Sequence, residues 1–160
     1  MNINSLSKKY SVRKLDENDV DIIYDMSCKN DIFYQYHPPF VTRESILDDM
    51  GALPPGKGYD DKFYVGFFEN DSLVGLMDLI LDYPEKEISF IGLFMTDTRY
   101  QNRGVGSGII SDVILCLKSS GYKEIRLGVD KGNPQSYSFW TKNKFTPIRE
   151  DTYILMGLRI

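Results

Sequence analysis

The sequence has few of the residues that build metal centres and disulfides. Its 160 residues include two cysteines and one histidine, and no Cys, His or carboxylate cluster has metal-ligand spacing. Cys28 and Cys116 each fall in an apolar-periodic stretch without a Cys-x-x-Cys spacing, which predicts buried, reduced thiols. The same shortage argues against Ser-His-Asp and Cys-His hydrolysis. We therefore expect no metal and a cytoplasmic location.

The chain also lacks a basic excess and a long apolar run. Its formal net charge is −4, whereas a general binder of the nucleic-acid backbone needs a basic surface. No stretch approaches the ~20 apolar residues that span a bilayer, and the start, MNINSLSKKY, has no apolar export signal. We expect neither a nucleic acid nor a membrane as partner. The acidic balance would suit a cationic amine substrate, but it more often serves solubility.

No proline, glycine, serine or charge run is long enough for a linker, so residues 1–160 are expected to form a single domain. Four helices are expected, beginning near Asp16, Thr42, Val105 and Asn133. The strand at 88–95 is apolar on both faces, as expected at the centre of a sheet. Short apolar runs predict seven strands, at residues 11–14, 62–68, 72–81, 88–95, 124–129, 145–148 and 152–160.

The stretch from Gln101 to Gly106, QNRGVG, lies between that central strand and a strongly amphipathic helix. Gly104 and Gly106 permit backbone conformations and a close approach that a Cβ would block. Several N–H groups can then converge on an anion at the positive end of the helix dipole, as a pyrophosphate requires. A tight turn without a ligand is the alternative, since two glycines before a helix are a weak pattern. The stretch matches neither the dinucleotide-binding G-x-G-x-x-G nor a Walker loop.

This stretch resembles the acetyl-CoA motif of the GNAT superfamily, Q/R-x-x-G-x-G/A. A second region resembles the family's pattern N-x-x-A-x-x-F-Y-x-K-x-G-F, with its spacing kept and three residues changed. The resemblance extends over nearly the whole chain, although residues 30–60 share only its general character. The residues that carry it are Leu93, Phe94, Met95, Tyr100 and 101–106 in the first region, and Asn133, Ser136, Phe139, Trp140, Lys142 and Phe145 in the second.

The resemblance implies a mixed α/β, GNAT-like fold, with a mostly antiparallel twisted sheet of about seven strands, a splayed parallel pair in it, and about four flanking helices. It also implies that strand backbone pairs with the pantetheine arm and that the motif's N–H groups hold the pyrophosphate, with Arg103 adding charge. Asn133 would contact the pantetheine region, act as a helix N-cap, or do both. The residues so assigned to the cofactor are Phe94, Met95, Thr96, Gln101, Asn102, Arg103, Gly104, Val105, Gly106, Ser107, Asn133 and Trp140.

The catalytic groups are less defined, because Trp140 stands where the family often has a tyrosine that protonates the leaving thiolate. An indole N–H donates a hydrogen bond but is no useful acid near neutral pH. Tyr137, one helical turn earlier, is the candidate acid, with a packing role as the alternative. The strand position that is glutamate in some relatives falls near Phe90, so a base must come from elsewhere. Asp78 is the candidate, because partial burial in the apolar run LMDLIL would raise its pKa, with a solvent-facing strand residue as the alternative.

Three other groups complete the candidates. Asp82 and Glu87 are alternative bases, as is a water-mediated route. His37, in YQYHPPF, is either a substrate contact or structural.

The expected function is N-acetyltransfer from acetyl-CoA to a primary amine of a small molecule or a peptide, by direct attack in a ternary complex. The alternatives are a longer acyl donor, an antibiotic or polyamine as acceptor, and a non-catalytic acyl-CoA-binding or sensor module. A plain turn with no CoA affinity is the third reading of the glycine loop. The apolar tail YILMGLRI would serve either a homodimer interface or a core strand.

Overall fold

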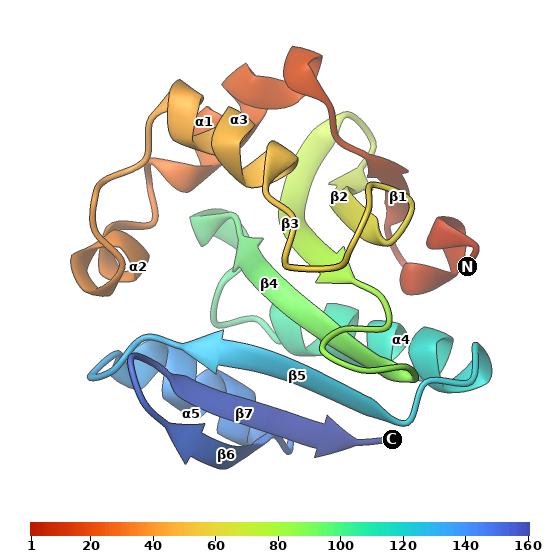
Figure 1. The fold of residues 1–160 in the computed structure, drawn as a ribbon. Helices are drawn as coiled ribbons and strands as arrows, with labels where there is room; N and C mark the ends of the chain where they lie inside the picture. The colour runs from red at the N-terminus through yellow and green to blue at the C-terminus, as the bar shows by residue number, and fades with distance from the viewer.

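The computed structural model describes all 160 residues. Seven strands form one sheet in the order β1-β2-β3-β4-β5-β7-β6, and every neighbouring pair is antiparallel except β4 and β5 (Figure 1). The strands are β1 (Ser11–Lys14), β2 (Lys62–Glu69), β3 (Ser72–Ile80), β4 (Ile88–Thr96), β5 (Glu124–Val129), β6 (Thr146–Glu150) and β7 (Ile154–Arg159). The helices are α1 (Val20–Ser27), α2 (Asp31–Tyr36), α3 (Arg43–Gly51), α4 (Val105–Ser119) and α5 (Pro134–Lys142).

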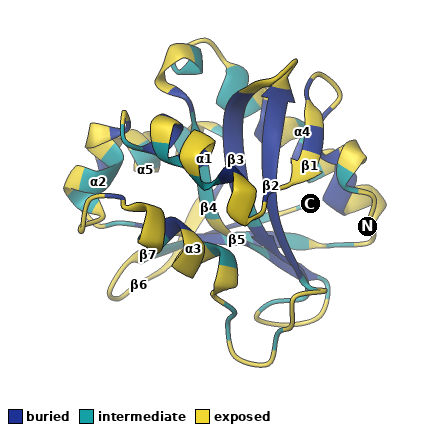
Figure 2. Cartoon of the chain, turned by 90° about the horizontal axis from the view of Figure 1, so that it is seen from above, coloured by how far each residue is buried: buried dark blue, intermediate teal, exposed yellow.

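Helices cover both faces of the sheet, and two apolar clusters fill the space between. On one face α4 packs with Ile109, Val113 and Leu117, which repeat every four residues and are almost fully buried. On the other face α1 and α3 pack with Ile23 and Ile46. Because both of their faces are covered, β2 and β3 are buried over nearly their whole length (Figure 2).

The sheet splits between its two parallel strands. The pairing of β4 with β5 runs from Ile88 opposite Glu124 to Ile91 opposite Leu127 and then stops. Beyond that point β4 continues to Thr96, paired only with β3, and β5 continues to Val129, paired only with β7. The ends of these strands therefore diverge and leave unpaired backbone in the middle of the sheet (Figure 1).

The prediction of a mixed α/β sheet with a parallel central pair is confirmed, and two local details differ from the sequence analysis. A fifth helix, α2, lies between the helices expected near Asp16 and Thr42, and none of its residues is buried. Because it buries no stripe of side chains, its sequence lacks the apolar periodicity from which a helix is predicted. At the end of α5 the sequence predicts that Asn143 takes the left-handed conformation, but Lys144 takes it, and Asn143 Nδ2 donates to the Phe139 carbonyl at 2.8 Å.

Asp19 ties the start of α1 to β1. Its carboxylate accepts hydrogen bonds from both terminal nitrogens of Arg13, at 2.8 and 2.7 Å, and from the Asp16 backbone N–H at 2.9 Å. The hydrogen bonds from Arg13 hold the pKa of Asp19 below its usual value, against the effect of burial. This contribution to stability is present above the unfolded-state pKa of about 3.9 and is lost as the pH falls through the lower folded-state pKa.

We therefore expect Asp19→Asn to lower the free energy of unfolding at pH 7 by about 1–2 kcal/mol. This figure is below the full value of charged hydrogen bonds, because Arg13 is half exposed and solvent screens the pair. Urea unfolding measures the free energy of unfolding of the variant and of the unsubstituted protein. The difference between the two should be smaller at pH 3 than at pH 7. Asp21→Asn is the control, since Asp21 pairs with Arg43 in solvent and should matter little. An equal gap at both pH values would contradict this account.

Candidate active site

A cavity of 710 Å³ opens where β4 leaves the sheet and α4 begins. Its wall brings together the end of β4, the loop before α4, and the first turns of α4 and α5. All the residues predicted for the cofactor line this cavity except Arg103, which is exposed at the surface of the loop. They are Phe94, Met95, Thr96, Gln101, Asn102, Gly104, Val105, Gly106, Ser107, Asn133 and Trp140.

The N-terminus of α4 is shaped to receive an anion. Gly104 precedes the helix with a φ of 77°, in the left-handed region, and no side chain caps the helix. The first backbone N–H groups of a helix have no partner within it, so here they are free to face the cavity. Gly106 keeps the wall close-packed, since a Cβ there would lie 3.1 Å from the Phe139 ring. The chain thus fits a pyrophosphate at this end of the cavity.

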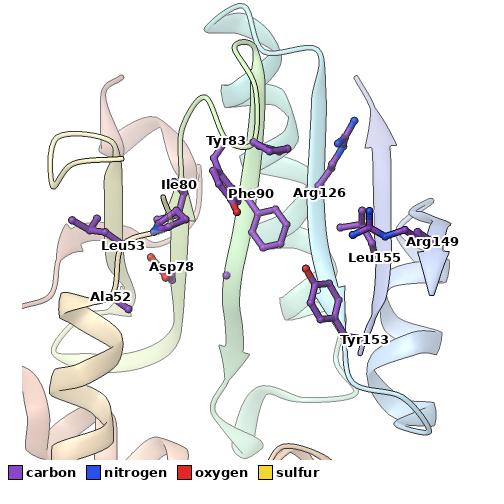
Figure 3. A pocket seen from close by; sticks show the side chains of 13 residues that line it. Ala52, Leu53, Asp78, Ile80, Tyr83, Phe90, Arg126, Arg149, Tyr153 and Leu155 are labelled. Atoms are coloured by element: carbon purple, nitrogen blue, oxygen red, sulfur yellow. The ribbon is translucent and has the colours of Figure 1, made fainter. Parts of the chain in front are cut away.

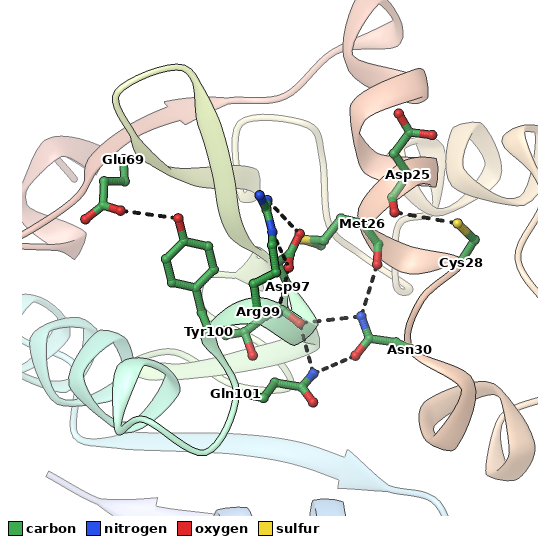
Figure 4. Close-up of polar contacts among 10 residues, drawn as sticks. Asp25, Met26, Cys28, Asn30, Glu69, Asp97, Arg99, Tyr100 and Gln101 are labelled. Atoms are coloured by element: carbon green, nitrogen blue, oxygen red, sulfur yellow. Dashed lines mark hydrogen bonds and ion pairs between the residues drawn. The ribbon is translucent and has the colours of Figure 1, made fainter.

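Gln101 joins three segments around the cavity mouth (Figure 4). Its Nε2 donates to Asn30 Oδ1 at 2.7 Å and to the Thr96 carbonyl at 3.0 Å. Asn30, which is buried, donates in turn to the Met26 carbonyl at the end of α1, at 3.2 Å. The side chain of this motif residue therefore fixes the α1–α2 connection against the end of β4.

Replacing Gln101 by Met should remove both donors while keeping the length of the side chain. We expect a loss of about 1–2 kcal/mol in unfolding free energy, because the buried Asn30 Oδ1 is left without its partner. Hydrogen exchange in α2 should become faster, which mass spectrometry can measure. Gln135→Met is the matched control, since Gln135 lines the same cavity but makes no side-chain hydrogen bond. Unchanged stability and exchange for Gln101→Met would contradict the tethering role.

The α5 wall of the cavity is aromatic. Trp140 is 6% exposed and packs in a cluster with Phe94, Phe139 and Phe145, with ring centroids 5.0–6.0 Å apart. The side chain of Asn133 is almost buried, and its Oδ1 accepts a hydrogen bond from the Ser136 N–H at 3.1 Å. Asn133 is therefore an N-cap that also lines the cavity. Tyr137 is 38% exposed and does not line it.

A second cavity, of 530 Å³, lies where strands β3 to β7 face the loop after α3 (Figure 3). The two cavities approach each other at the split in the sheet, since Gly92 lines the second cavity and Phe94, two residues later, lines the first. A group bound in one can thus meet a group bound in the other where β4 and β5 diverge.

Asp78 is the carboxylate in the second cavity. Its Oδ2 accepts a hydrogen bond from Lys62 Nζ at 2.7 Å, and its buried Oδ1 has no protein partner. Burial raises the pKa of Asp78, although Lys62 opposes that effect. A Cβ at Gly92 would lie 2.9 Å from Asp78 Oδ2, so glycine is required for the carboxylate to approach β4. Asp78 is thus a partly desolvated acceptor beside the split.

The other polar candidates lie outside both cavities. Asp82 accepts a hydrogen bond from the Glu87 N–H at 2.8 Å within a turn, and Glu87 pairs with Lys123 at 2.5 Å. His37 pairs with Asp130 at 3.0 Å and so joins the α2 region to the end of β5. In these contacts the three residues hold turns and loops together.

Sequence reasoning missed Lys62 and the two arginines of the second cavity, Arg126 and Arg149. The alternation in EIRLGV was the available signal for Arg126, because Ile125 and Leu127 are buried on the opposite face of β5. Lys62 stands at the first position of a strand, where a buried lysine is uncommon.

The comparisons with known proteins agree with this geometry. A profile of the acetyltransferase (GNAT) family matches residues 25–145. The chain belongs to the GNAT family of acetyltransferases. It is therefore an acyltransferase of a family that uses acetyl-CoA as acyl donor. No helix of this GNAT protein is long and apolar enough to cross a membrane. A search of curated proteins finds no match.

Solved structures share the GNAT fold over almost the whole chain. An acetyltransferase from Thermus thermophilus superposes with a TM-score of 0.80 at 17% identity, covering 95% of this chain and 97% of that one. The PaiA N-acetyltransferase of Thermoplasma acidophilum, solved with coenzyme A, superposes with a TM-score of 0.70 at 18% identity, covering 94% of this chain and 98% of that one. The ribosomal-protein-S18-alanine N-acetyltransferase of Escherichia coli superposes with a TM-score of 0.66 at 15% identity, covering 94% of this chain and 93% of that one. At these identities the likeness concerns the fold alone.

Proposed function

We propose that this GNAT protein transfers acetyl from acetyl-CoA directly to a primary amine of a small molecule or a peptide, within a ternary complex. The observation that carries the proposal is the pair of cavities that approach each other at the β4–β5 split. The first has the uncapped helix end that suits a pyrophosphate, and the second has a carboxylate that suits an amine. Holding both reactants at one gap supplies much of the rate enhancement, without a covalent acyl-enzyme.

In this proposal the motif holds the donor mainly through its backbone. The N–H groups of the loop and of the first turn of α4 bind the pyrophosphate, and the unpaired edge of β4 at Phe94, Met95 and Thr96 binds the pantetheine arm. Asn133 and Trp140 form the wall opposite that edge. Arg103, on the surface of the loop, adds a long-range positive charge.

Asp78 is the proposed base, acting directly or through one water. An amine must lose its proton before it attacks; the Asp78 carboxylate lines the second cavity, and its Oδ1 has no protein partner. Lys62 keeps this carboxylate available as an anion by opposing the cost of burial. Tyr137 remains the candidate acid for the leaving thiolate, although it lies outside the cavity wall; solvent at the cavity mouth is the alternative source of that proton.

Trp140 in the usual tyrosine position favours a second candidate, a non-catalytic module that binds acyl-CoA. A longer acyl donor is a further alternative for the same site. We also propose that residues 1–160 act as one domain in the cytoplasm, which the single sheet and the free thiols of Cys28 and Cys116 support. A homodimer remains a prediction for analytical ultracentrifugation.

The function is tested by thiol release from acetyl-CoA, and from longer acyl-CoA donors, with and without an amine panel. The proposal predicts thiol release that requires both acetyl-CoA and an amine. A binding module predicts calorimetric affinity for acetyl-CoA and no amine-dependent thiol. Faster thiol release from a longer acyl-CoA than from acetyl-CoA would show that the enzyme transfers a longer acyl group by the same reaction.

A further inference from the structure

The second cavity has opposite charges at its two ends (Figure 3). Asp78 lies at the β3 end, close to the split where an acceptor amine would be acetylated. Arg126 and Arg149 lie on β5 and β6, on the far side of β4. Tyr83 and Phe90 lie between Asp78 and Arg126 in the view of Figure 3. The cavity thus presents an anion, an apolar middle and then two cations.

The two arginines have donors to spare. Arg126 uses only its Nε, which donates to Glu124 Oε1 at 2.6 Å, and Arg149 uses only its Nε, which pairs with Asp151. A guanidinium has five N–H donors, so the four terminal N–H bonds of each group are uncommitted. The Arg126 side chain is 24% exposed, and its pKa is raised by the hydrogen bond to Glu124. Such a partly buried, anchored guanidinium is suited to bidentate contact with a carboxylate.

The strand register sets the separation of the two ends. Phe90 pairs with Arg126 across the parallel strands, and Gly92 lies two residues further along β4. Asp78 pairs with Leu93 on β4, so its Cα lies two strands and three residues from the Cα of Arg126, roughly 14 Å away. With a hydrogen bond of about 3 Å at each end, this leaves a span that an aliphatic chain of six carbons covers. Ile80, Phe90 and Leu155 supply an apolar floor for such a chain.

From these observations we infer that the acceptor of this enzyme is an amine with a carboxylate at its far end, as in an ω-amino acid, rather than a polyamine. The inference rests on the proposed amine acetylation and specifies its substrate class. The amine lies at the Asp78 carboxylate, the carbon chain lies over Phe90, and the substrate carboxylate binds Arg126 and Arg149. A second ammonium at that end meets two guanidinium groups that can donate hydrogen bonds but accept none, and it is therefore disfavoured.

Three amines of equal length test the inference: ε-aminocaproate, hexylamine and hexamethylenediamine, which end in a carboxylate, a methyl group and an ammonium. The expected order of kcat/KM is aminocaproate, then hexylamine, then the diamine. Arg126→Gln and Arg149→Gln should each lower kcat/KM for aminocaproate about tenfold, with little change for hexylamine. Arg159→Gln is the control, since Arg159 belongs to β7 but does not line the cavity.

Equal rates for aminocaproate and the diamine, or an equal effect of the substitutions on all three amines, would overturn the inference and leave amine acetylation standing. Absence of thiol release with every amine would instead sink the proposed function. In that case titration of the CoA-saturated protein with the same three amines still decides the charge preference. Tighter binding of aminocaproate, weakened by Arg126→Gln, supports the inference, and no preference refutes it.

Discussion

Gly104→Asp is expected to abolish acetyl-CoA binding while leaving the protein folded. Gly104 has a φ of 77°, and no neighbouring group lies within 4 Å of a Cβ built there, so the only strain on a side chain comes from the left-handed backbone. Aspartate tolerates the left-handed region better than most residues and is a preferred N-cap residue. Its capping hydrogen bonds should therefore offset the backbone strain of the substitution. Its carboxylate, however, would take up the free N–H groups and repel a pyrophosphate. We expect affinity to fall by more than about a hundredfold.

Isothermal titration with acetyl-CoA measures this effect, and thermal unfolding checks the fold. The matched control is Gly56→Asp, because Gly56 has the same φ of 77° and equally open space in the loop after α3. The control should bind acetyl-CoA as the unsubstituted protein does. If Gly104→Asp keeps its affinity, the N-terminus of α4 is not the pyrophosphate site.

Asp78→Asn is expected to lower kcat/KM for the amine by about 10²–10⁴-fold, because the amide cannot take the proton of the attacking amine. Acetyl-CoA affinity should be unchanged, since Asp78 lines only the second cavity. Burial raises the pKa of Asp78, so the unsubstituted enzyme should lose activity as the pH falls through that raised value. A pH profile of kcat/KM should lack this acidic limb in the variant.

A structural explanation of that loss can be separated from the chemical one. Asp78→Asn leaves the buried Lys62 without its carboxylate, which is costly for stability. The Lys62→Met/Asp78→Asn double variant removes both charges and should regain much of the lost stability without regaining activity. Recovery of activity in the double variant would show that Asp78 is structural and that the base lies elsewhere.

The cofactor cavity was predictable because its chemistry is local in sequence. Glycines before an amphipathic helix specify an uncapped helix end within a few residues, and the stretch from Gln101 to Gly106 contained that information. The strands followed from apolar runs of ordinary length, whereas the parallel pair was implied by the family resemblance. Helix α2 was missed because it buries no residue and so has no periodic stripe.

The second cavity depends on contacts between distant segments, which no local pattern encodes. Arg126 faces it because β5 pairs with β4 at Phe90, and Arg149 reaches it because β7 enters the sheet between β5 and β6. Asp78 was a candidate from its apolar neighbours, but its partner Lys62 comes from the preceding strand of the hairpin. The acceptor side could therefore be assembled only from the folded chain.

The most direct test of the account is mass spectrometry of an amine incubated with isotopically labelled acetyl-CoA and the protein. We predict the labelled acetyl group on the amine, none retained on the protein, and no product with Gly104→Asp. Acetyl-CoA binding without any acetylated amine would contradict the catalytic proposal, and a labelled protein would contradict direct transfer.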